Sequence, residues 1–445
     1  MKILFISLGC DKNLADSEEM LGLLTGNGHE IVDSEEEADA ILINTCCFIH
    51  DAKEESVNTI LEMAEYKKTG TCKILIVTGC MAQRYKEEIT EEIPEVDAVL
   101  GTTSYGDIVK ALNEAEAGHV FQEFKDINAL PEDSGRRVIT TGGHFGYLKI
   151  AEGCDKHCTY CIIPSLRGKF RSVPEERLLK QAEYMASQGV RELILVAQET
   201  TVYGTDLYGK KTLHILLKKL CQIKGIRWIR VLYCYPEEIY DELIQTMKEE
   251  KKICHYLDLP IQHASDRILK RMGRRTTQAE LVEIVNKLRR EIPDIVLRTT
   301  LISGFPGETQ EDHEELMGFV DEMEFDRLGV FTYSPEEDTP AATMPDQVAE
   351  EVKEARRDEI MELQQEISYD KGTDRIGQEL LVMIEGKVAD ESAYIGRTYG
   401  DAPKVDGYIF VQTGELLMTG DFAKVRVTGA LEYDLIGELA DEYTE

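Results

Sequence analysis

The sequence has little positive charge. Among its 445 residues, 50 are Lys or Arg and 84 are Asp or Glu, which gives a formal net charge of −34. So acidic a surface repels phosphate backbones unless a local basic patch offsets it, and it suits a basic protein partner better. Acidity that serves only to keep the chain soluble would give the same composition. Charge alone therefore argues against a nucleic-acid ligand but identifies no partner.

The chain also lacks any membrane-spanning or secretory segment. No run approaches the roughly 18 consecutive apolar residues that a membrane helix requires. Residues Met1 to Leu8 carry one Lys and a short apolar run without a cleavage-site pattern, so we expect a buried strand there. The sequence therefore predicts a cytoplasmic protein with no membrane partner. Its 11 cysteines would stay reduced, and cysteine patterns then indicate metal binding or catalysis more often than disulfides.

Residues 1–122 alternate apolar strands with amphipathic helices. Strands are expected at Lys2–Leu8, Ala40–Asn44, Lys73–Val77 and Ala98–Leu100. Helices are expected at Ser17–Leu24, Lys53–Lys67, about Arg84–Glu92 and from about Tyr105. This βαβα order predicts an α/β domain with a doubly wound parallel sheet. A polar segment without clear periodicity follows, and we place a linker at residues 123–139.

Residues 140–371 resume the alternation with six further strand candidates. They lie at Tyr147–Ala151, Glu192–Ala197, Trp228–Tyr233, Tyr256–Leu259, Val296–Ile302 and Leu328–Phe331. Six βα units in succession predict a full or partial βα barrel of the TIM type, followed by a long charged helix at about 348–369. Residues 372–445 contain short β runs between Gly, Asp and Pro turns, at Leu380–Ile384, Tyr408–Val411 and Lys424–Val427. They predict a small antiparallel β-barrel.

One loop carries three cysteines at the spacing C-x3-C-x2-C. Cys154, Cys158 and Cys161 follow the first strand of the predicted barrel, at the end where active sites of βα barrels lie. Three thiolates on one loop can bind three irons of a four-iron cluster and leave the fourth iron open to a ligand. A zinc loop is the alternative, but zinc prefers four N or S ligands, and only His157 lies nearby as a fourth. The spacing therefore favours an iron–sulfur cluster.

Two later segments could contribute to a ligand site beside this loop. Gly304 and Gly307 follow a predicted strand, and closely spaced glycines allow a ligand to approach the backbone. A simple strand-to-helix turn explains the same glycines equally well. Glu199 follows the strand that ends at Ala197. We therefore name Glu199, Gly304 and Gly307 as candidate ligand-binding residues.

A second set of three cysteines is dispersed in sequence but shares one topological position. Cys10, Cys46 and Cys80 each follow a predicted strand, and the carboxyl ends of parallel strands lie at one edge of a sheet. Three thiolates at that edge would bind a second four-iron cluster. Buried packing is the usual role of an isolated cysteine, but it does not explain the shared position. Cys47 is the ambiguous neighbour, and we choose Cys46 because it follows Asn44-Thr45 directly.

Taken together, these motifs resemble the methylthiotransferase family of radical S-adenosylmethionine enzymes over essentially the whole chain. The motifs that carry the resemblance are Leu8-Gly9-Cys10, Asp16-Ser17-Glu18, Asn44-Thr45-Cys46, Thr78 to Arg84 and Cys161-Ile162-Ile163-Pro164. The resemblance implies an N-terminal cluster domain, a radical S-adenosylmethionine barrel and a C-terminal, OB-like TRAM barrel. It implies two [4Fe–4S] clusters and S-adenosylmethionine as cofactors.

The resemblance also implies a reaction and roles for the candidate residues. An unactivated C–H bond would be replaced by C–S–CH3, which requires radical chemistry because no base removes such a proton at neutral pH. S-adenosylmethionine would bind the open iron of the Cys154/Cys158/Cys161 cluster, and the other cluster would carry the sulfur, which a second S-adenosylmethionine would methylate. Contacts with S-adenosylmethionine are implied for Tyr160, Glu199, Gly304 and Gly307.

The residues around the first cysteine indicate a branch of this family. Ser7-Leu8-Gly9-Cys10 followed by Lys12-Asn13 resembles the RimO branch, which modifies the β-carbon of an aspartate in ribosomal protein uS12. The MiaB branch, the alternative, modifies adenosine in tRNA and usually has Gln-Met-Asn after this cysteine. Asp11 stands where RimO proteins commonly have Pro, and Cys47 where they commonly have Gly. The implied partners are uS12, free or in the small ribosomal subunit, and a reductant such as flavodoxin or ferredoxin.

The charge of the C-terminal region gives an independent indication of the substrate. Residues 372–445 contain 6 Lys or Arg and 15 Asp or Glu, a net charge of −9. A tRNA-binding barrel needs cations for phosphates, whereas an acidic barrel suits a basic ribosomal protein. Arg167, Lys169 and Arg171 lie beside the radical cluster and would fit either substrate. We therefore do not expect tRNA as the partner, and a non-catalytic metal-binding protein that docks on ribosomes is the alternative of another class.

Overall fold

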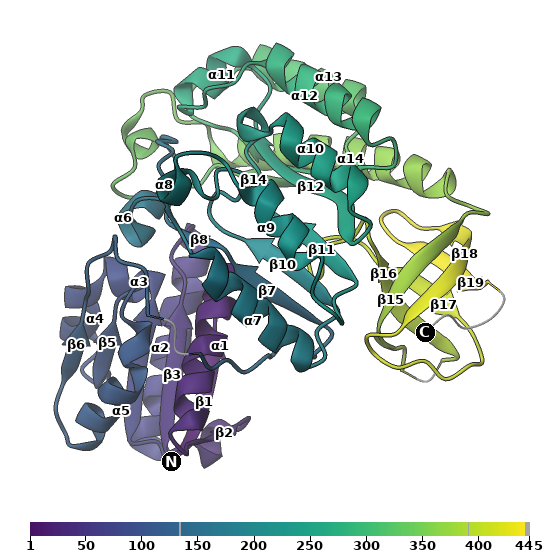
Figure 1. Cartoon of the computed structure of the whole chain (residues 1–445). Coiled ribbons are helices and arrows are strands. Elements are labelled where there is room, and N and C mark those ends of the chain that lie inside the picture. The colour runs from purple at the N-terminus through teal and green to yellow at the C-terminus, as the bar shows by residue number, and fades with distance from the viewer. Residues whose placement is uncertain (133–134, 390, 441–445) are drawn as a thin grey trace.

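Short apolar segments in the first part of the chain form a parallel sheet. The computed structural model describes residues 1–132, 135–389 and 391–440 (Figure 1). The strands are β1 (Lys2–Ser7), β2 (Glu30–Val32), β3 (Ala40–Thr45), β4 (Ile74–Gly79), β5 (Ala98–Leu100) and β6 (Phe121–Glu123). Their order is β2-β1-β3-β4-β5-β6, and every pairing is parallel, which confirms the predicted doubly wound sheet. The sequence did not reveal β2 and β6, because these three-residue edge strands are only partly buried and carry no apolar run.

Helices cover both faces of this sheet. They are α1 (Asp11–Gly26), α2 (His50–Thr69), α3 (Cys80–Arg84), α4 (Lys86–Glu92) and α5 (Ile108–Glu116), with 3-10 turns at Glu35–Glu37 and Tyr105–Asp107. Apolar residues of α1 and α5 pack on one face, and those of α2, α3 and α4 on the other. The helix expected from Ser17 begins at Asp11 instead, because its polar first turns are buried against the central unit and show no apolar period. The helix expected near Arg84–Glu92 is two helices that meet at Tyr85.

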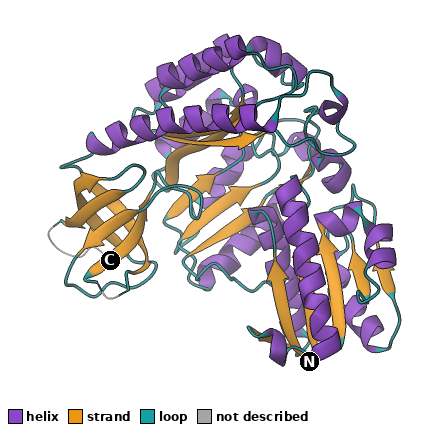
Figure 2. Ribbon diagram, turned by 180° about the vertical axis from the view of Figure 1, so that it is seen from behind, coloured by secondary structure: helices purple, strands orange, loops and turns teal. Residues whose placement is uncertain are grey.

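The central unit is an open, six-stranded parallel sheet with helices outside it (Figures 1 and 2). Its strands are β7 (Phe145–Lys149), β10 (Glu192–Val196), β11 (Trp228–Val231), β12 (Ile253–Gln262), β13 (Val296–Ser303) and β14 (Arg327–Thr332), in the order β14-β13-β12-β11-β10-β7. The expected βα barrel is therefore partial, because β7 and β14 do not pair to close it. A small antiparallel pair, β8 (Ala151–Glu152) and β9 (Arg171–Ser172), brackets the loop that carries Cys154.

Fourteen α-helices are present in the described residues, and nine of them belong to the central unit. These are α6 (Ile163–Arg167), α7 (Glu175–Ser187), α8 (Thr205–Tyr208), α9 (Leu213–Leu220), α10 (Asp241–Glu249), α11 (Asp266–Arg271), α12 (Gln278–Glu291), α13 (Gln310–Met323) and α14 (Glu350–Thr373), with 3-10 turns at Pro236–Glu238 and Pro340–Thr343. The expected long charged helix is α14. Within the described ranges, no helix is long and apolar enough to cross a membrane.

The C-terminal unit is a closed five-stranded barrel. Its strands are β15 (Glu379–Lys387), β16 (Ala393–Thr398), β17 (Ile409–Gln412), β18 (Phe422–Ala430) and β19 (Leu435–Leu439). The expected all-antiparallel arrangement needs one correction, since β17 and β19 pair in parallel. An odd number of strands cannot close a ring in which every neighbour is antiparallel. Residues 133–134 of the predicted linker and residues 390 and 441–445 of the predicted C-terminal domain lie outside the described residues.

The C-terminal barrel packs against the amino ends of the central strands. Glu192 opens β10 and is fully buried, where it accepts hydrogen bonds from Arg230 of β11 and Arg397 of β16, each at 2.7 Å. The ring of Trp228, the single tryptophan, meets the ring of Phe422 edge-on with centroids 4.9 Å apart. The carboxyl ends of the central strands, where the cysteine loop lies, therefore face away from this barrel.

We expect Arg397→Met to loosen the docking of the C-terminal barrel. It removes the cation shared by Glu192 and Glu385, and leaving a buried carboxylate short of its partner costs about 3–5 kcal/mol. The fluorescence of Trp228 during urea unfolding would report the loss. The control Arg426→Met breaks an exposed pair with Glu379 in the same barrel and should cost below about 1 kcal/mol. Equal effects of the two substitutions would contradict the assignment of the docking energy to Arg397.

Candidate active site

The structure brings Cys10, Cys46 and Cys80 to one edge of the N-terminal sheet. They follow β1, β3 and β4, which are neighbours, and the strand register aligns Asn44 with Thr78. Cys46 and Cys80 therefore lie two residues beyond aligned positions, at the carboxyl ends of their strands. Burial raises the pKa of the Cys46 thiol to about 12, and nearby Cys80 and Cys10 add to the shift. The three thiols thus share one neighbourhood.

Cys46 makes the close contact with the loop that carries Cys10. Gly9 has a φ of +83°, and a Cβ atom there would lie 2.6 Å from the Cβ of Cys46, so the approach requires glycine. Cys47 is fully buried beside Arg84. Its thiol pKa is raised by burial and, to a smaller extent, by Cys80 and Cys46. The two adjacent cysteines therefore have different surroundings, and Cys46 is the one against Gly9.

Asn13 holds these loops together and links them to the central unit. Its side-chain amide donates to the carbonyl oxygens of Leu8, at 3.1 Å, and Thr45, at 2.9 Å. Its Oδ1 atom accepts from the guanidinium of Arg167 and lies 3.8 Å from the Sγ of Cys80. Burial raises the pKa of the Cys80 thiol, and the charge of Arg167 opposes that shift. A buried cation from the central unit therefore lies beside the N-terminal cysteines.

Arg167 belongs to a buried charge network between the two units. Its guanidinium pairs with Asp16 of α1 at 2.9 Å, and the ammonium of Lys149 binds both Asp16 and Glu152. Arg167 is only 3% exposed, so it is not available to phosphates, although the sequence placed it in a basic run beside the substrate. Glu152 stands two residues before Cys154. The network thus connects the N-terminal cysteine edge to the start of the other cysteine loop.

Cys154, Cys158 and Cys161 lie together on the loop between β8 and α6. Cys154 and Cys158 are buried, and Cys161 is partly exposed. Burial raises the pKa of the Cys154 thiol to about 11 and that of Cys161 to about 12, and Cys158 adds to both shifts because the thiols are close. The backbone N–H of Thr159 donates to the carbonyl of Met272 at 2.9 Å, which fixes the middle of the loop.

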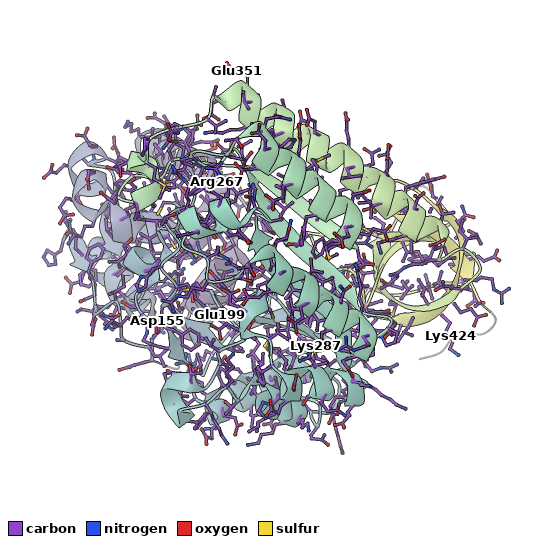
Figure 3. The ribbon with its side chains drawn as sticks, turned by 90° about the horizontal axis from the view of Figure 1, so that it is seen from above. Asp155, Glu199, Arg267, Lys287, Glu351 and Lys424 are labelled. Carbon is purple, nitrogen blue, oxygen red and sulfur yellow. The ribbon has the colours of Figure 1, made fainter. Side chains whose placement is uncertain are left out.

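Glu199 is a buried carboxylate beside this loop. It is 1% exposed, and Figure 3 labels it among the side chains seen from above. Its Oε1 accepts from the backbone N–H of Thr201 at 2.9 Å, and its Oε2 has no partner among the described residues. Burial raises its pKa to about 7, and its charge in turn raises the pKa of Cys154. An unpartnered buried carboxylate next to the cysteines suits a ligand that donates hydrogen bonds.

Tyr160, within the cysteine loop, contacts the loop that carries Gly304 and Gly307. The ring of Phe305 stands between those of Tyr160 and Tyr333, with centroids 6.3 and 5.3 Å away. Gly304 and Gly307 both have positive φ, but the space beside them is filled by the side chains of Lys353 and Arg271, respectively. Close protein packing therefore accounts for these glycines. Their contact with S-adenosylmethionine stays a prediction.

Two tyrosines after β11 join the two sets of cysteines, and neither was predicted as a site residue. The hydroxyl of Tyr233 donates to Asp11, the residue after Cys10, at 3.3 Å. The hydroxyl of Tyr235 lies 3.5 Å from the Sγ of Cys158. Tyr233 has a positive φ of 61°, a backbone conformation that is uncommon for tyrosine and that the sequence does not predict. The only available signal was their position at a predicted strand end, since Tyr233 closes the expected strand and Tyr235 follows it.

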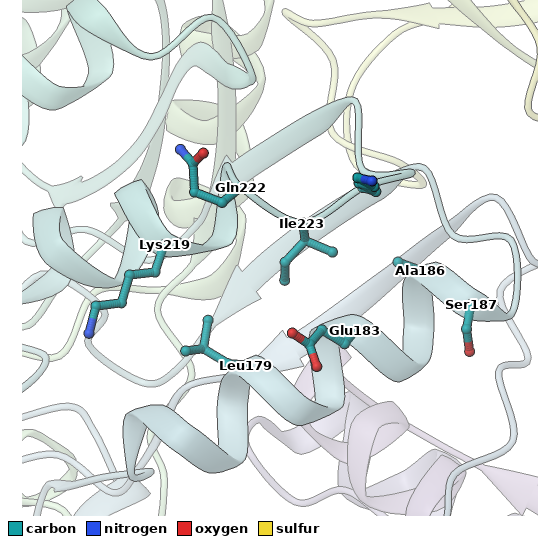
Figure 4. A pocket seen from close by; sticks show the side chains of 8 residues that line it. Leu179, Glu183, Ala186, Ser187, Lys219, Gln222 and Ile223 are labelled. Carbon is teal, nitrogen blue, oxygen red and sulfur yellow. The ribbon is translucent and has the colours of Figure 1, made fainter.

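The hollow that the described residues form in the outer helix layer lies away from the cysteines. A hollow of about 580 Å³ lies between α7 and α9 in the outer helix layer, lined by Leu179, Glu183, Ala186, Ser187, Lys219, Gln222, Ile223 and Lys224 (Figure 4). None of the candidate residues lines it. No three His, Cys, Asp or Glu side chains among the described residues gather around one metal-ion position. A four-iron cluster binds each cysteine through a different iron, so its ligands surround a larger object than one ion.

Three family models match successive parts of the chain. Residues 2–101 match the uncharacterized protein family UPF0004, residues 148–320 the radical SAM superfamily, and residues 376–440 the TRAM domain. Membership of the radical SAM superfamily implies a [4Fe–4S] cluster and S-adenosylmethionine as cofactors.

Solved structures confirm the fold. The radical S-adenosylmethionine methyltransferase TsrM from Kitasatospora setae, with cobalamin and a [4Fe–4S] cluster bound, superposes with a TM-score of 0.56 at 14% identity, over 76% of this chain and 73% of TsrM. The cobalamin-dependent S-adenosylmethionine radical enzyme OxsB gives a TM-score of 0.51 at 15% identity, over 82% of this chain and 56% of OxsB. Both are enzymes of the radical class with the same α/β architecture.

Curated relatives match the chain from end to end. A protein of Lachnoclostridium phytofermentans is 65% identical over 437 residues, which are 98% of this chain and 99% of the relative. A protein of Clostridioides difficile is 50% identical over 442 residues, 99% of each chain. Both are named ribosomal protein uS12 methylthiotransferase RimO. At this identity and coverage, the chain belongs to the RimO family of ribosomal protein uS12 methylthiotransferases.

Proposed function

We propose that this enzyme attaches a methylthio group to the β-carbon of an aspartate in ribosomal protein uS12, using two [4Fe–4S] clusters and S-adenosylmethionine. The observation that carries the proposal is the apposition of two cysteine trios across the segment Tyr233–Tyr235. One trio lies in the segment that matches the radical SAM superfamily, and the other lies at the carboxyl edge of the N-terminal sheet. The full-length relatives named for uS12 support the choice of substrate.

The residues of each trio fit a cluster with one open iron. Cys154, Cys158 and Cys161 would hold the cluster that binds S-adenosylmethionine, and the orphan oxygen of Glu199 supports a ligand beside it. Cys10, Cys46 and Cys80 would hold the second cluster. Burial raises the thiol pKa of Cys46 and Cys80, so the charge of an iron ion would help these two buried thiols to ionise. When bound, these groups supply the electron, the radical and the sulfur that side chains cannot provide.

The chain itself positions the two sites and keeps water out. The buried network of Asp16, Lys149, Glu152 and Arg167 fixes the N-terminal edge against the central unit. On the other side of the half-barrel, Arg84 donates to the carbonyl oxygen of Glu337, which follows β14, at 2.7 Å. Contacts at both edges hold the N-terminal unit across the mouth of the half-barrel, so a substrate residue between the trios is enclosed and oriented.

The binding of S-adenosylmethionine should depend on the ionisation of Glu199. The ionised carboxylate is the stronger hydrogen-bond acceptor and attracts a cationic ligand, and burial raises the pKa of Glu199 to about 7. Affinity should therefore fall as pH drops from 8 to 6, by about tenfold, since only about a tenth of the carboxyl is ionised at pH 6. Equilibrium binding to the reconstituted enzyme would measure this. Glu199→Gln should bind more weakly at pH 8 and lose most of the pH dependence; an unchanged profile would remove Glu199 from the site.

The acidic surface supports a basic protein as partner. A net charge of −34, and −9 over residues 372–445, favours a ribosomal protein over tRNA. We further propose that uS12 is met free or in the small ribosomal subunit, and that flavodoxin or ferredoxin delivers the electrons.

The decisive experiment supplies both candidate substrates to the same enzyme. The full chain, reconstituted anaerobically with iron and sulfide, is incubated with S-adenosylmethionine, a reductant, and either purified uS12 or bulk tRNA. We expect the mass of a methylthio group on one aspartate of uS12 and none on tRNA nucleosides. A uS12 variant with Asn at the modified position is the matched control. Modified adenosine in tRNA, with unmodified uS12, would overturn the proposal in favour of the tRNA branch.

A further inference from the structure

Lys12 is a buried cation without an anionic partner. It lies in the first turn of α1, is 7% exposed, and its Nζ stands 3.2 Å from the centroid of the Tyr233 ring. Within the described residues, the ammonium group of Lys12 forms no ion pair with a carboxylate. Its neighbour Asp11 accepts instead from the hydroxyl of Tyr233, at 3.3 Å. The aromatic face offers a cation some stabilisation, but it does not neutralise the charge.

Comparison with the other buried cations shows that this situation is exceptional. Nine Lys or Arg residues are buried in the described part of the chain. Eight of them form an ion pair, namely Arg137, Lys149, Arg167, Arg230, Arg274, Lys353, Arg356 and Arg397. Burying a charge is costly unless it is paired, so a chain that pairs eight of nine leaves the ninth for a partner outside itself.

A ligand can reach the ammonium. Some buried side-chain nitrogen and oxygen atoms of the described residues have neither solvent contact nor a hydrogen-bond partner. The Nζ atom of Lys12 does not belong to that group, so it keeps some contact with solvent. Lys12 follows Cys10 by two residues, and its ring partner Tyr233 precedes Tyr235, which touches Cys158. The free cation therefore stands between the two cysteine trios, at the mouth of the half-barrel.

We propose that Lys12 binds the carboxylate of the aspartate that is modified. This inference rests on the proposed function and specifies how its substrate is recognised. The reacting β-carbon is bonded directly to the carboxylate carbon, so fixing the carboxylate fixes the C–H bond between the two sites. A buried substrate carboxylate also needs a cation, and among the buried Lys and Arg residues that the structure describes, Lys12 is the one without an ion pair.

The test is whether the effect on affinity of removing the substrate carboxylate depends on the presence of Lys12. Binding of purified uS12, and of a uS12 variant with Asn at the modified position, is measured with the reconstituted full chain in the absence of S-adenosylmethionine. Wild-type enzyme should bind the Asn variant at least about tenfold more weakly. Lys12→Met should weaken binding of uS12 to a similar degree but bind the two substrates equally, because the charge they would recognise is gone. Lys12→Arg should restore part of the preference.

Controls separate a binding role from a structural one. Lys110→Met removes a lysine that stands 4.9 Å over the ring of Phe121, far from the cysteines, and should leave both affinities unchanged. Iron content and the visible spectrum of Lys12→Met should match those of the wild type. If Lys12→Met still prefers aspartate over asparagine as strongly as the wild type, Lys12 does not bind the carboxylate. If wild-type enzyme leaves uS12 unmodified, the proposed function itself fails.

Discussion

Replacing any one of Cys154, Cys158 or Cys161 with Ala should reduce the cleavage of S-adenosylmethionine to the level of an enzyme-free control. The loop offers three thiolates and no spare thiol, because its other potential metal ligands are the carboxylate of Asp155 and the imidazole of His157. With two thiolates the cluster loses its anchorage, and the chemistry it supplies cannot be replaced by a side chain. The measurement is 5′-deoxyadenosine formed under anaerobic conditions with dithionite. Iron content should fall by about half, from roughly eight atoms per chain.

A buried cysteine in a different environment provides the control for this series. Cys221 is 6% exposed at the end of α9, in the outer helix layer. Cys221→Ala should keep the wild-type iron content and the wild-type rate of cleavage. Full cleavage activity in Cys154→Ala would show that the loop is not the site of S-adenosylmethionine reduction.

The placement of the cysteines could be predicted because it depends only on strand order. Cys10, Cys46 and Cys80 each follow an apolar run, and parallel strands bring their carboxyl ends to one edge. The contacts between units could not be predicted in this way. Asp16 is buried because Lys149 and Arg167, which are more than a hundred residues away in sequence, meet it in the folded chain. No local sequence pattern indicates such a partner, so the predicted helix began at Ser17, six residues after the observed start of α1 at Asp11.

The residues between the two cysteine trios could not be predicted either, because their roles also depend on contacts in the folded chain. Tyr233 acquires its position from a backbone conformation with positive φ, and Lys12 acquires its significance only when the partners of every other buried cation are known. In the sequence, Lys12 belongs to the motif around Cys10, and Arg167 belongs to a basic run beside the Cys154 loop. In the folded chain these two cations differ in their partners. Arg167 forms an ion pair with Asp16, whereas Lys12 lies over the ring of Tyr233.

Replacing Cys10, Cys46 or Cys80 with Ala should abolish the transfer of the methylthio group but leave part of the cleavage of S-adenosylmethionine. The second trio is supplied by strands of another unit, whereas the Cys154 loop is built within the central unit between β8 and α6. Loss of the sulfur-carrying cluster therefore leaves the site of cleavage formed. The readouts are the methylthio mass on uS12 and 5′-deoxyadenosine from the same reaction. We expect the first to vanish and the second to stay within about tenfold of wild type.

Cys47 is the matched control, because it is adjacent to Cys46, fully buried and close to Cys80. Its thiol lies beside Arg84 instead of against Gly9, so Cys47→Ala should retain both products. If Cys47→Ala abolishes transfer and Cys46→Ala does not, the third ligand is Cys47. If the Cys10, Cys46 and Cys80 variants lose cleavage as well, while their remaining iron shows the first cluster intact, then the two trios do not divide the reaction between them. The buried network at Arg167 would then couple cleavage to the state of the second cluster, since it connects Cys80 to the start of the Cys154 loop.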